Sequence, residues 1–329
     1  MRFLPDAEHR ELARTLDGLL ASADTPGAAR AWAAGDHAPG RALWSRLAET
    51  GVFALAVPEP YEGMGPLPVE LALSFVELGR HAVPGPVVET VAAAALLDRL
   101  GDAGAAAAWL PRVAAGKAVL SLCAPEHGGP YALDADAADA VLVVDGDVLR
   151  LAEGAGPVQP SADPVRRLAR PLGGTVLARG PEVARAAGHA AGVAALATAA
   201  QSLGLGLALL DRTVSYVRQR TQFGVAIGSF QAVKHRLADG LVALEFARPL
   251  LYAAALALAA GSDAAPREIA AAKVTAGEAA HAAARTALQL HGAVGYTAEL
   301  DLSLWIRKAR PLRDAWGTPA ACRARVLAP

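Results

Sequence analysis

Four neighbouring residues at a break between two predicted helices have groups that can hold a phosphate and a ring. In chain order they are Arg220, Gln222, Phe223 and Gly224. A guanidinium binds phosphate through two parallel hydrogen bonds, and an aromatic face covers a heterocycle. The glycine lets the backbone come close to a ligand. The sequence here therefore predicts a site for a ligand that contains both a phosphate and a ring.

Helical periodicity predicts the elements that must position this corner. Helices are expected in the first third of the chain over 8–21, 41–48, 69–80, 90–100 and 103–115. Toward the C-terminus they are expected over 183–219, 229–261, 266–291 and 301–310, the last of them stopped by Pro311. Long helices with short connections predict an antiparallel four-helix bundle.

The pattern changes in the middle of the chain. Short apolar or alternating runs, bounded by Gly, Pro and Asp, lie at 119–123, 140–144, 148–151 and 174–178. The sequence Asp145-Gly146-Asp147 between two of them predicts a hairpin turn. We therefore expect an N-terminal helical domain at 1–116, a small antiparallel β domain at 117–181 and the bundle at 182–329.

Composition excludes several classes of function. The chain has 329 residues, of which 53% are hydrophobic and 19% charged, and its formal net charge is -1. That balance gives no field that attracts nucleic acid or an anionic membrane. Two distant cysteines, Cys123 and Cys322, predict reduced thiols, with no disulfide framework and no metal site. No signal peptide is readable, and runs such as 250–260 are shorter than the roughly 20 residues of a membrane span. We expect a soluble, cytoplasmic protein.

Two motifs resemble those of acyl-CoA dehydrogenases. The corner at 220–224, followed by Phe230-Gln231, resembles their C-terminal domain, and Gln-Leu-His-Gly-Ala-Val-Gly-Tyr at 289–296 resembles a second block. Ala293 stands there in place of the second glycine of a Gly-Gly pair. A weaker N-terminal match includes Glu-Leu-Gly-Arg at 77–80. The resemblance spans nearly the whole chain and implies a mainly α fold with a middle antiparallel β domain, here short.

The resemblance also implies a chemistry. In that family FAD takes the β hydride of an acyl-CoA thioester while a carboxylate removes the α proton, and two subunits build each flavin site. The residues that match the neighbouring subunit's contribution are Arg220, Gln222, Phe223, Gln231, Gln289, His291 and Gly292. Thr318, from a matching Gly-Thr pair, is a further candidate cofactor contact.

The contribution that the family's flavin receives from its own subunit is mostly absent. The Thr-Glu-Pro-x-x-Gly-Ser-Asp loop is matched only by Ala-Pro-Glu-His-Gly-Gly at 124–129, and no tryptophan occurs in 117–180. The usual catalytic glutamate is replaced by Trp316, and its alternative location aligns near Ala194. Neither an indole nor a methyl group can accept a proton from carbon. Asp314 is a weak candidate for a substitute base.

This asymmetry suggests the non-catalytic subunit of a heteromeric, α2β2-type acyl-CoA dehydrogenase that completes the flavin site of a catalytic partner. Some bacterial family members that act on sterol side chains or bulky acyl-CoAs look like this. One alternative is a self-associating dehydrogenase that uses Asp314 or another base. Others are a flavin-free scaffold and an enzyme acting on a carrier-protein thioester. The acyl chain stays open.

Overall fold

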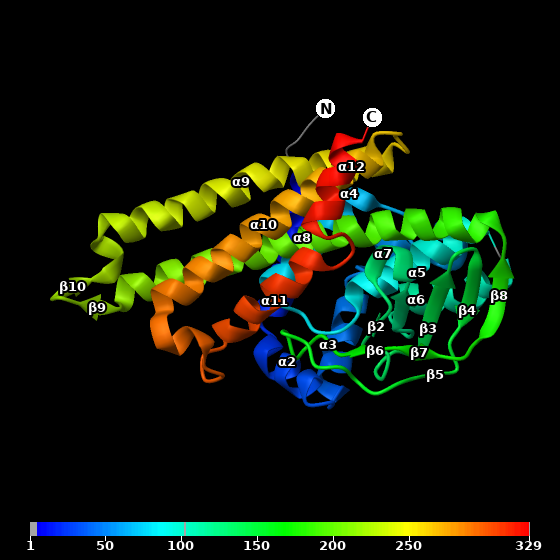
Figure 1. Cartoon of the computed structure of the whole chain (residues 1–329), viewed down its shortest axis with the longest axis horizontal. Helices are drawn as coiled ribbons and strands as arrows, with labels where there is room; N and C mark the ends of the chain where they lie inside the picture. Colours follow the sequence, from blue (N-terminus) through cyan, green and yellow to red (C-terminus); the bar gives the residue numbers. More distant parts are fainter. Residues whose placement is uncertain (1–4, 102, 329) are drawn as a thin grey trace.

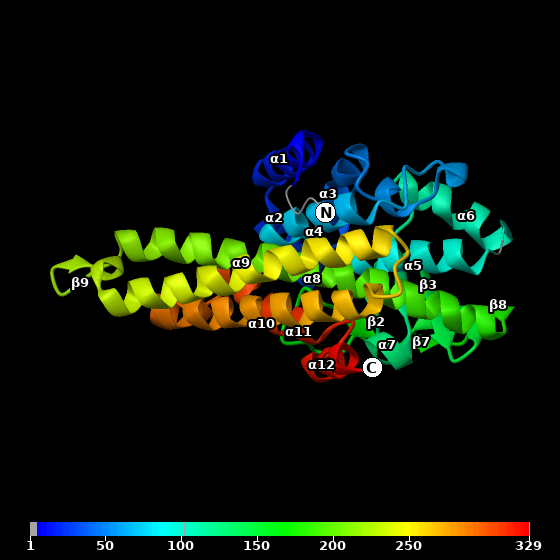
Figure 2. The same cartoon turned by 90° about the horizontal axis from the view of Figure 1, so that it is seen from above.

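The N-terminal third of the chain is a layer of helices that packs against the bundle (Figures 1 and 2). The computed structural model describes residues 5–101 and 103–328. The helices are α1 Ala7–Ala21, α2 Thr25–Ala33, α3 Ala38–Glu49, α4 Pro68–Arg80, α5 Val87–Leu100 and α6 Ala103–Ala114, with 3-10 turns η1 Ala54–Ala56 and η2 Glu59–Tyr61. The five expected helices are found within a few residues, and α2 is an additional one.

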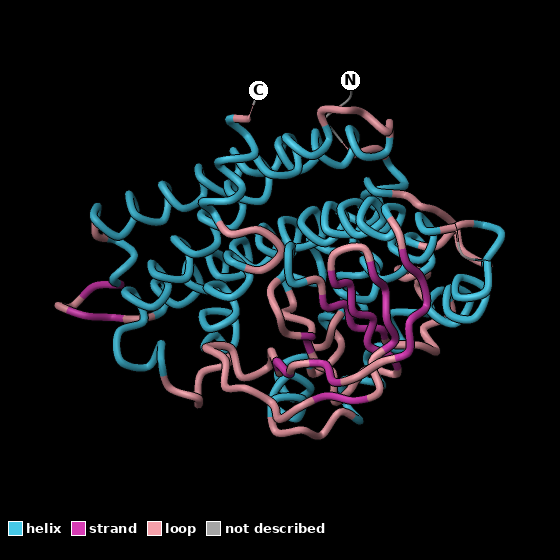
Figure 3. The backbone as a smooth tube through the Cα atoms, turned by 45° about the vertical axis from the view of Figure 1, so that its right-hand side comes forward, coloured by secondary structure: helices cyan, strands magenta, loops and turns pink. Residues whose placement is uncertain are grey.

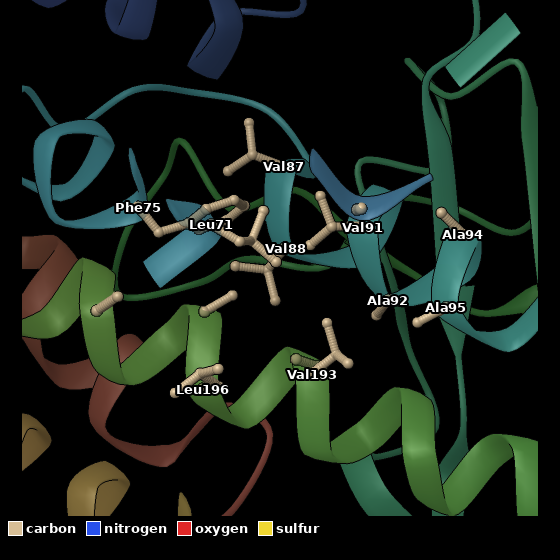
Figure 4. Close-up of a cluster of buried hydrophobic side chains, with 14 of the residues drawn as sticks. Leu71, Phe75, Val87, Val88, Val91, Ala92, Ala94, Ala95, Val193 and Leu196 are labelled. Atoms are coloured by element: carbon tan, nitrogen blue, oxygen red, sulfur yellow. The ribbon is translucent and has the colours of Figure 1, made fainter. Parts of the chain in front are cut away.

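Helices α4 and α5 bury their apolar faces against α8 (Pro181–Gln219), the longest helix of the chain. Figure 4 shows Leu71 and Phe75 of α4 beside Val88 of α5, with Val193 and Leu196 of α8 facing them. All five side chains are buried. Removing such a side chain costs about 2–5 kcal/mol, because the neighbours do not close the cavity fully. This packing fixes the N-terminal domain on the bundle.

A small mixed sheet lies beside the half of the molecule opposite the expected ligand corner (Figures 1 and 3). Its strands are β1 Leu120–Cys123, β3 Ala140–Asp145, β4 Val148–Leu151 and β8 Thr175–Arg179, in the order β1-β3-β4-β8. The expected hairpin is confirmed, since Asp145 pairs with Val148. The expectation of a wholly antiparallel domain is wrong in one pairing, because β1 runs parallel to β3.

The parallel pairing follows from the connection between those two strands. Residues 124–139 form a crossover that contains the short helix α7 Pro125–Gly128 and the strand β2 Ala132–Leu133. Parallel neighbours need such a crossover of a dozen or more residues. The remaining short strands are β5 Gly154–Ala155, β6 Leu168–Ala169 and β7 Pro171–Leu172.

Four helices form the expected bundle: α8, α9 Gln231–Ala259, α10 Ala265–His291 and α11 Leu302–Asp314. The predicted stop at Pro311 is wrong, because α11 continues to Asp314. A short helix that was not expected, α12 Pro319–Leu327, follows. Thr318 caps its N-terminus, since the Thr318 hydroxyl accepts a hydrogen bond from the Ala321 amide at 3.3 Å.

Two bundle helices, α8 and α9, are long and apolar enough to cross a membrane by length and composition alone. The apolar window of α8 is 94% buried, as in the core helix of a bundle, whereas that of α9 is only 28% buried. Helix α9 exposes Leu241, Val242 and Phe246, the last at 70%. These three apolar side chains of α9 are therefore left uncovered by the described residues, beside exposed charged residues such as Glu245.

Asp134 gives the β domain a predicted pH dependence. The residue is 1% exposed, its Oδ1 accepts from the Arg167 amide at 3.3 Å, and Oδ2 has no hydrogen-bond partner among the described residues. Burial raises the pKa of Asp134 to about 7. Because the folded pKa exceeds the unfolded one, this group stabilises the fold as pH falls from 7 to 4.

Replacing Asp134 by asparagine should remove that dependence. The variant is expected to be more stable than the natural protein at pH 8, by up to roughly 4 kcal/mol, and the two should converge near pH 4. Urea denaturation of both proteins across this range measures the difference. Parallel stability curves would contradict the assignment.

Candidate functional site

The expected ligand corner is a two-stranded hairpin at one end of the bundle (Figure 1). After α8, the strands β9 Thr221–Gln222 and β10 Val225–Ala226 pair, and the turn η3 Ile227–Ser229 leads into α9. Phe223 and Gly224 join the strands with φ of 55° and 80°. Positive φ at both positions is the geometry of a tight hairpin turn, and it costs a non-glycine residue about 1–2 kcal/mol.

The strained residue is also the most exposed large apolar one described. The Phe223 ring is 91% exposed, and the nearby Phe230 is 40% exposed with its ring centroid 6.4 Å away. Strain that the surroundings maintain is typical of functional sites. The hairpin therefore holds an aromatic ring out where the described residues of this chain leave it almost fully exposed.

An open groove of about 690 Å³ lies between α9 and α10, next to the hairpin end of the bundle. Arg236 of α9 and Arg285 and Gln289 of α10 line it, together with Gly292 and Tyr296. Its size falls in the range of roughly 300–1,000 Å³ that ligand sites occupy. Gln289 and Gly292 had been expected at a ligand site on sequence grounds.

The two arginines of the groove were not identified from the sequence. Arg285 precedes Gln289 by one helical turn, so the (i, i+4) spacing would have placed both on one face. Among the described residues, the guanidinium groups of Arg220, Arg236 and Arg285 form no hydrogen bond or ion pair. Unpaired guanidinium groups suit the recognition of phosphate, which they bind through two hydrogen bonds.

His291 is placed under this surface and not on it. The imidazole is 6% exposed, stacks on Tyr216 at 4.0 Å, and has Nδ1 2.8 Å from the carbonyl oxygen of Ala287. Burial lowers the pKa of His291, so the neutral ring is favoured. The stack joins the last turn of α8 to the end of α10. His291 thus positions the groove, and its contact with a cofactor stays a prediction.

Thr318 is not brought to the same end of the bundle as the other expected residues. It adjoins Gly317, whose carbonyl accepts from Lys273 at 3.2 Å. At 1.5 Å per residue, Lys273 lies about 24 Å along α10 from Gln289. The end that holds the hairpin contains the other predicted contacts: Arg220, Gln222, Phe223, Gln231, Gln289 and Gly292.

A second cavity, of about 260 Å³, lies between the β domain and α11. Gly128, Tyr131, Arg166, Asp314 and Trp316 are among its lining residues. Asp314 is engaged by two guanidinium groups, with Arg310 Nε at 3.1 Å and Arg313 Nε at 3.6 Å. This pairing argues against Asp314 as a free proton acceptor.

The position expected for the catalytic base is occupied by a fixed indole. The Trp316 ring is 8% exposed, and its Nε1–H donates to the Glu89 carboxylate at 3.0 Å. Ala194, the alternative location, is fully buried inside α8. Neither of the two positions that could supply a base therefore does so.

One group among the described residues has metal-ligand geometry, although none was expected. Ligand atoms of Asp17, Glu77 and His81 lie within 4.8 Å of one another. His81 Nε2 is already 2.8 Å from Asp17, and Arg80 Nε is 3.6 Å from Glu77. The three groups are thus satisfied without an ion.

Comparison with known proteins agrees with this fold. The family model described as acyl-CoA dehydrogenase, N-terminal domain, matches residues 6–117, and that described as the C-terminal domain matches 184–328. Acyl-CoA dehydrogenase IpdE2 of Mycobacterium tuberculosis is 34% identical over 93% of this chain and 92% of its own length. This chain therefore belongs to the acyl-CoA dehydrogenase family of oxidoreductases.

Two solved structures extend the comparison to assemblies. The ChsE4-ChsE5 complex of Mycobacterium tuberculosis is similar with a TM-score of 0.83 and 25% identity, covering 99% of this chain and 98% of that chain. A variant of the Tcur3481-Tcur3483 steroid ACAD has a TM-score of 0.83 and 25% identity over 97% of this chain and 96% of that one. The expected fold class, mainly helical with a small β domain, is confirmed.

Proposed function

We propose that this chain is the non-catalytic subunit of a heteromeric acyl-CoA dehydrogenase that desaturates an acyl-CoA thioester. In this proposal the hairpin end of its bundle completes an FAD site in a catalytic partner subunit. The partner holds the flavin ring and supplies the catalytic base. The observation on which this depends is a separation within one chain. The guanidinium groups that could bind phosphate are exposed and unpaired, among the described residues, at the hairpin end of the bundle. The cavity that contains Trp316 lies elsewhere and offers no free base.

The residues at the bundle end fit the phosphate part of FAD. Arg220, Arg236 and Arg285 present guanidinium groups, and Gln222 and Gln289 add exposed amides. Gly292 has φ of 64° and nothing within 4 Å of the position where a Cβ would stand, so a ligand can approach its backbone. Bound there, FAD would supply hydride acceptance, and this chain would bind and orient its phosphates.

The uncovered face of α9 supports a partner subunit. Leu241, Val242 and Phe246 are exposed on α9, and Phe223 and Phe230 are exposed at the hairpin end of the same helix. Exposed apolar patches of this kind mark interaction sites. The ChsE4-ChsE5 structure, whose name gives two components, supports a heteromeric assembly, and a second copy of this chain is the alternative partner.

The remaining assignments follow the same proposal. A sterol-type acyl group is favoured by the word steroid in the name of the Tcur3481-Tcur3483 relative, and fatty acyl groups are the alternative. Cys123 and Cys322 are both buried and free, which suits a cytoplasmic protein.

Flavin content tests the proposal. The chain is to be purified alone and after co-expression with a catalytic homologue encoded beside it. We expect a colourless chain alone and a yellow complex that desaturates acyl-CoA. A chain that is yellow and turns over acyl-CoA by itself would sink the subunit assignment, and a colourless complex would favour a scaffold.

A further inference from the structure

Trp316 fills part of the cavity between the β domain and α11. Gly128 of α7 makes room for it, because a Cβ on Gly128 would lie 3.0–3.2 Å from three atoms of the indole. On another side the indole N–H reaches Glu89 of α5, which is 3% exposed. This is the one side-chain hydrogen bond of Glu89 among the described residues. The ring thus bridges two separate parts of the N-terminal half of the chain.

The backbone around Trp316, which sets the direction of the indole side chain, is also held in place. Trp316 has φ of 52°, in the left-handed region that aromatic residues rarely adopt. Lys273 Nζ donates to the carbonyls of Leu312 at 3.1 Å, Arg313 at 2.9 Å and Gly317 at 3.2 Å. A Cβ at Gly317 would stand 2.9 Å from Cys322 Sγ, so glycine is required there too.

We propose that Trp316 is a plug that keeps a tricyclic aromatic ring out of this cavity. The space left beside the indole is about 260 Å³, below the roughly 300 Å³ at which ligand sites begin. The Glu89 carboxylate, which could accept from an N–H of a flavin ring, is occupied by the indole N–H. The proposal deepens the subunit assignment, because a pair of chains would then hold a single flavin ring, in the partner.

The plug can be tested on this chain without a partner and without the phosphate corner. Lumiflavin, a flavin ring that has no ribityl phosphate, serves as the probe, and quenching of its fluorescence reports binding. Trp316→Gly removes the indole and also relieves the positive φ. Trp316→Phe is the matched control, since it keeps an aromatic ring in the cavity.

We expect no saturable quenching with the natural chain or with Trp316→Phe, and at least tenfold tighter binding with Trp316→Gly. Equal binding by the natural chain and Trp316→Gly would overturn the proposal. So would a folded Trp316→Gly variant, verified by circular dichroism, that binds lumiflavin no better than the natural chain.

A second variant keeps the test valid if Trp316→Gly fails to fold. Trp316→Gly leaves the buried Glu89 carboxylate unpaired, and Glu89→Gln/Trp316→Gly replaces that charge by a neutral amide. If this double variant binds lumiflavin at least tenfold more tightly than the natural chain, the proposal is supported. If it folds and binds no more tightly, the proposal is overturned. A failed subunit assignment would appear instead in the co-expression experiment, as turnover by the yellow chain alone or as a colourless complex, so separate measurements test the two ideas.

Discussion

Replacing Arg220 by alanine should release flavin from the complex. The Arg220 side chain is exposed and has no hydrogen-bond or ion-pair partner among the described residues, so a ligand phosphate would be its main interaction. A hydrogen bond to a charged group contributes about 1.5–3 kcal/mol, and its loss corresponds to roughly 10–150-fold weaker flavin binding. Titration of the flavin-free complex with FAD measures the change.

Two further variants make this result specific. Arg218→Ala removes an equally exposed arginine from the last turn of α8 and should leave flavin affinity unchanged. Arg220→Lys keeps the charge but loses the two-pronged geometry, so an intermediate loss is expected. The free energy of unfolding should change by no more than about 0.5 kcal/mol in Arg220→Ala, Arg218→Ala and Arg220→Lys. Full affinity in Arg220→Ala would remove the phosphate role.

The largest expected effect on stability comes from Lys273. Its ammonium is fully buried and satisfies three backbone carbonyls at the end of α11. Lys273→Met would leave those carbonyls without a donor, at about 1–3 kcal/mol each. Relief from burying the charge offsets part of that loss. We expect the free energy of unfolding to fall by about 2–5 kcal/mol at pH 7.

The pH dependence supplies a second readout for Lys273. Burial lowers its pKa to about 8 from an ordinary 10.5. Because the folded state loses this proton first, the lysine makes the natural protein relatively more stable as pH rises from 8 to 10.5. Lys273→Met should lack that rise. Lys234→Met, an exposed change on α9, is the control, and an equally small effect of both substitutions in urea denaturation would contradict the role of Lys273.

Local patterns in the sequence predict the helices well, but they do not reveal contacts made at long range. Periodicity and alanine content locate the long helices, because both act within a few residues. The predicted end of α11 at Pro311 was wrong. Proline removes one backbone donor, but Lys273, 39 positions before Leu312, donates to the carbonyls of Leu312 and Arg313 that follow the proline. The parallel pairing of β1 with β3 likewise depends on a crossover and not on either strand.

In the candidate site, too, local motifs predicted some features, whereas contacts between distant residues could not be predicted. A motif located the hairpin residues Arg220 to Gly224, and the expected break between helices is where the hairpin lies. Thr318 was predicted to contact the cofactor, although threonine before proline is also typical of a helix start, which is the role it has here. In contrast, the hydrogen bond between Trp316 and Glu89 joins residues 227 positions apart, and no local sequence pattern predicts it.

A structure of the co-purified complex with its flavin would show which subunit holds the flavin ring and which holds its phosphates. We expect the flavin ring to lie against the partner's β domain and the flavin phosphates to contact Arg220 and the groove that Gln289 lines. A flavin ring bound between Gly128 and Trp316 of this chain, with a carboxylate of this chain over the acyl group, would contradict it.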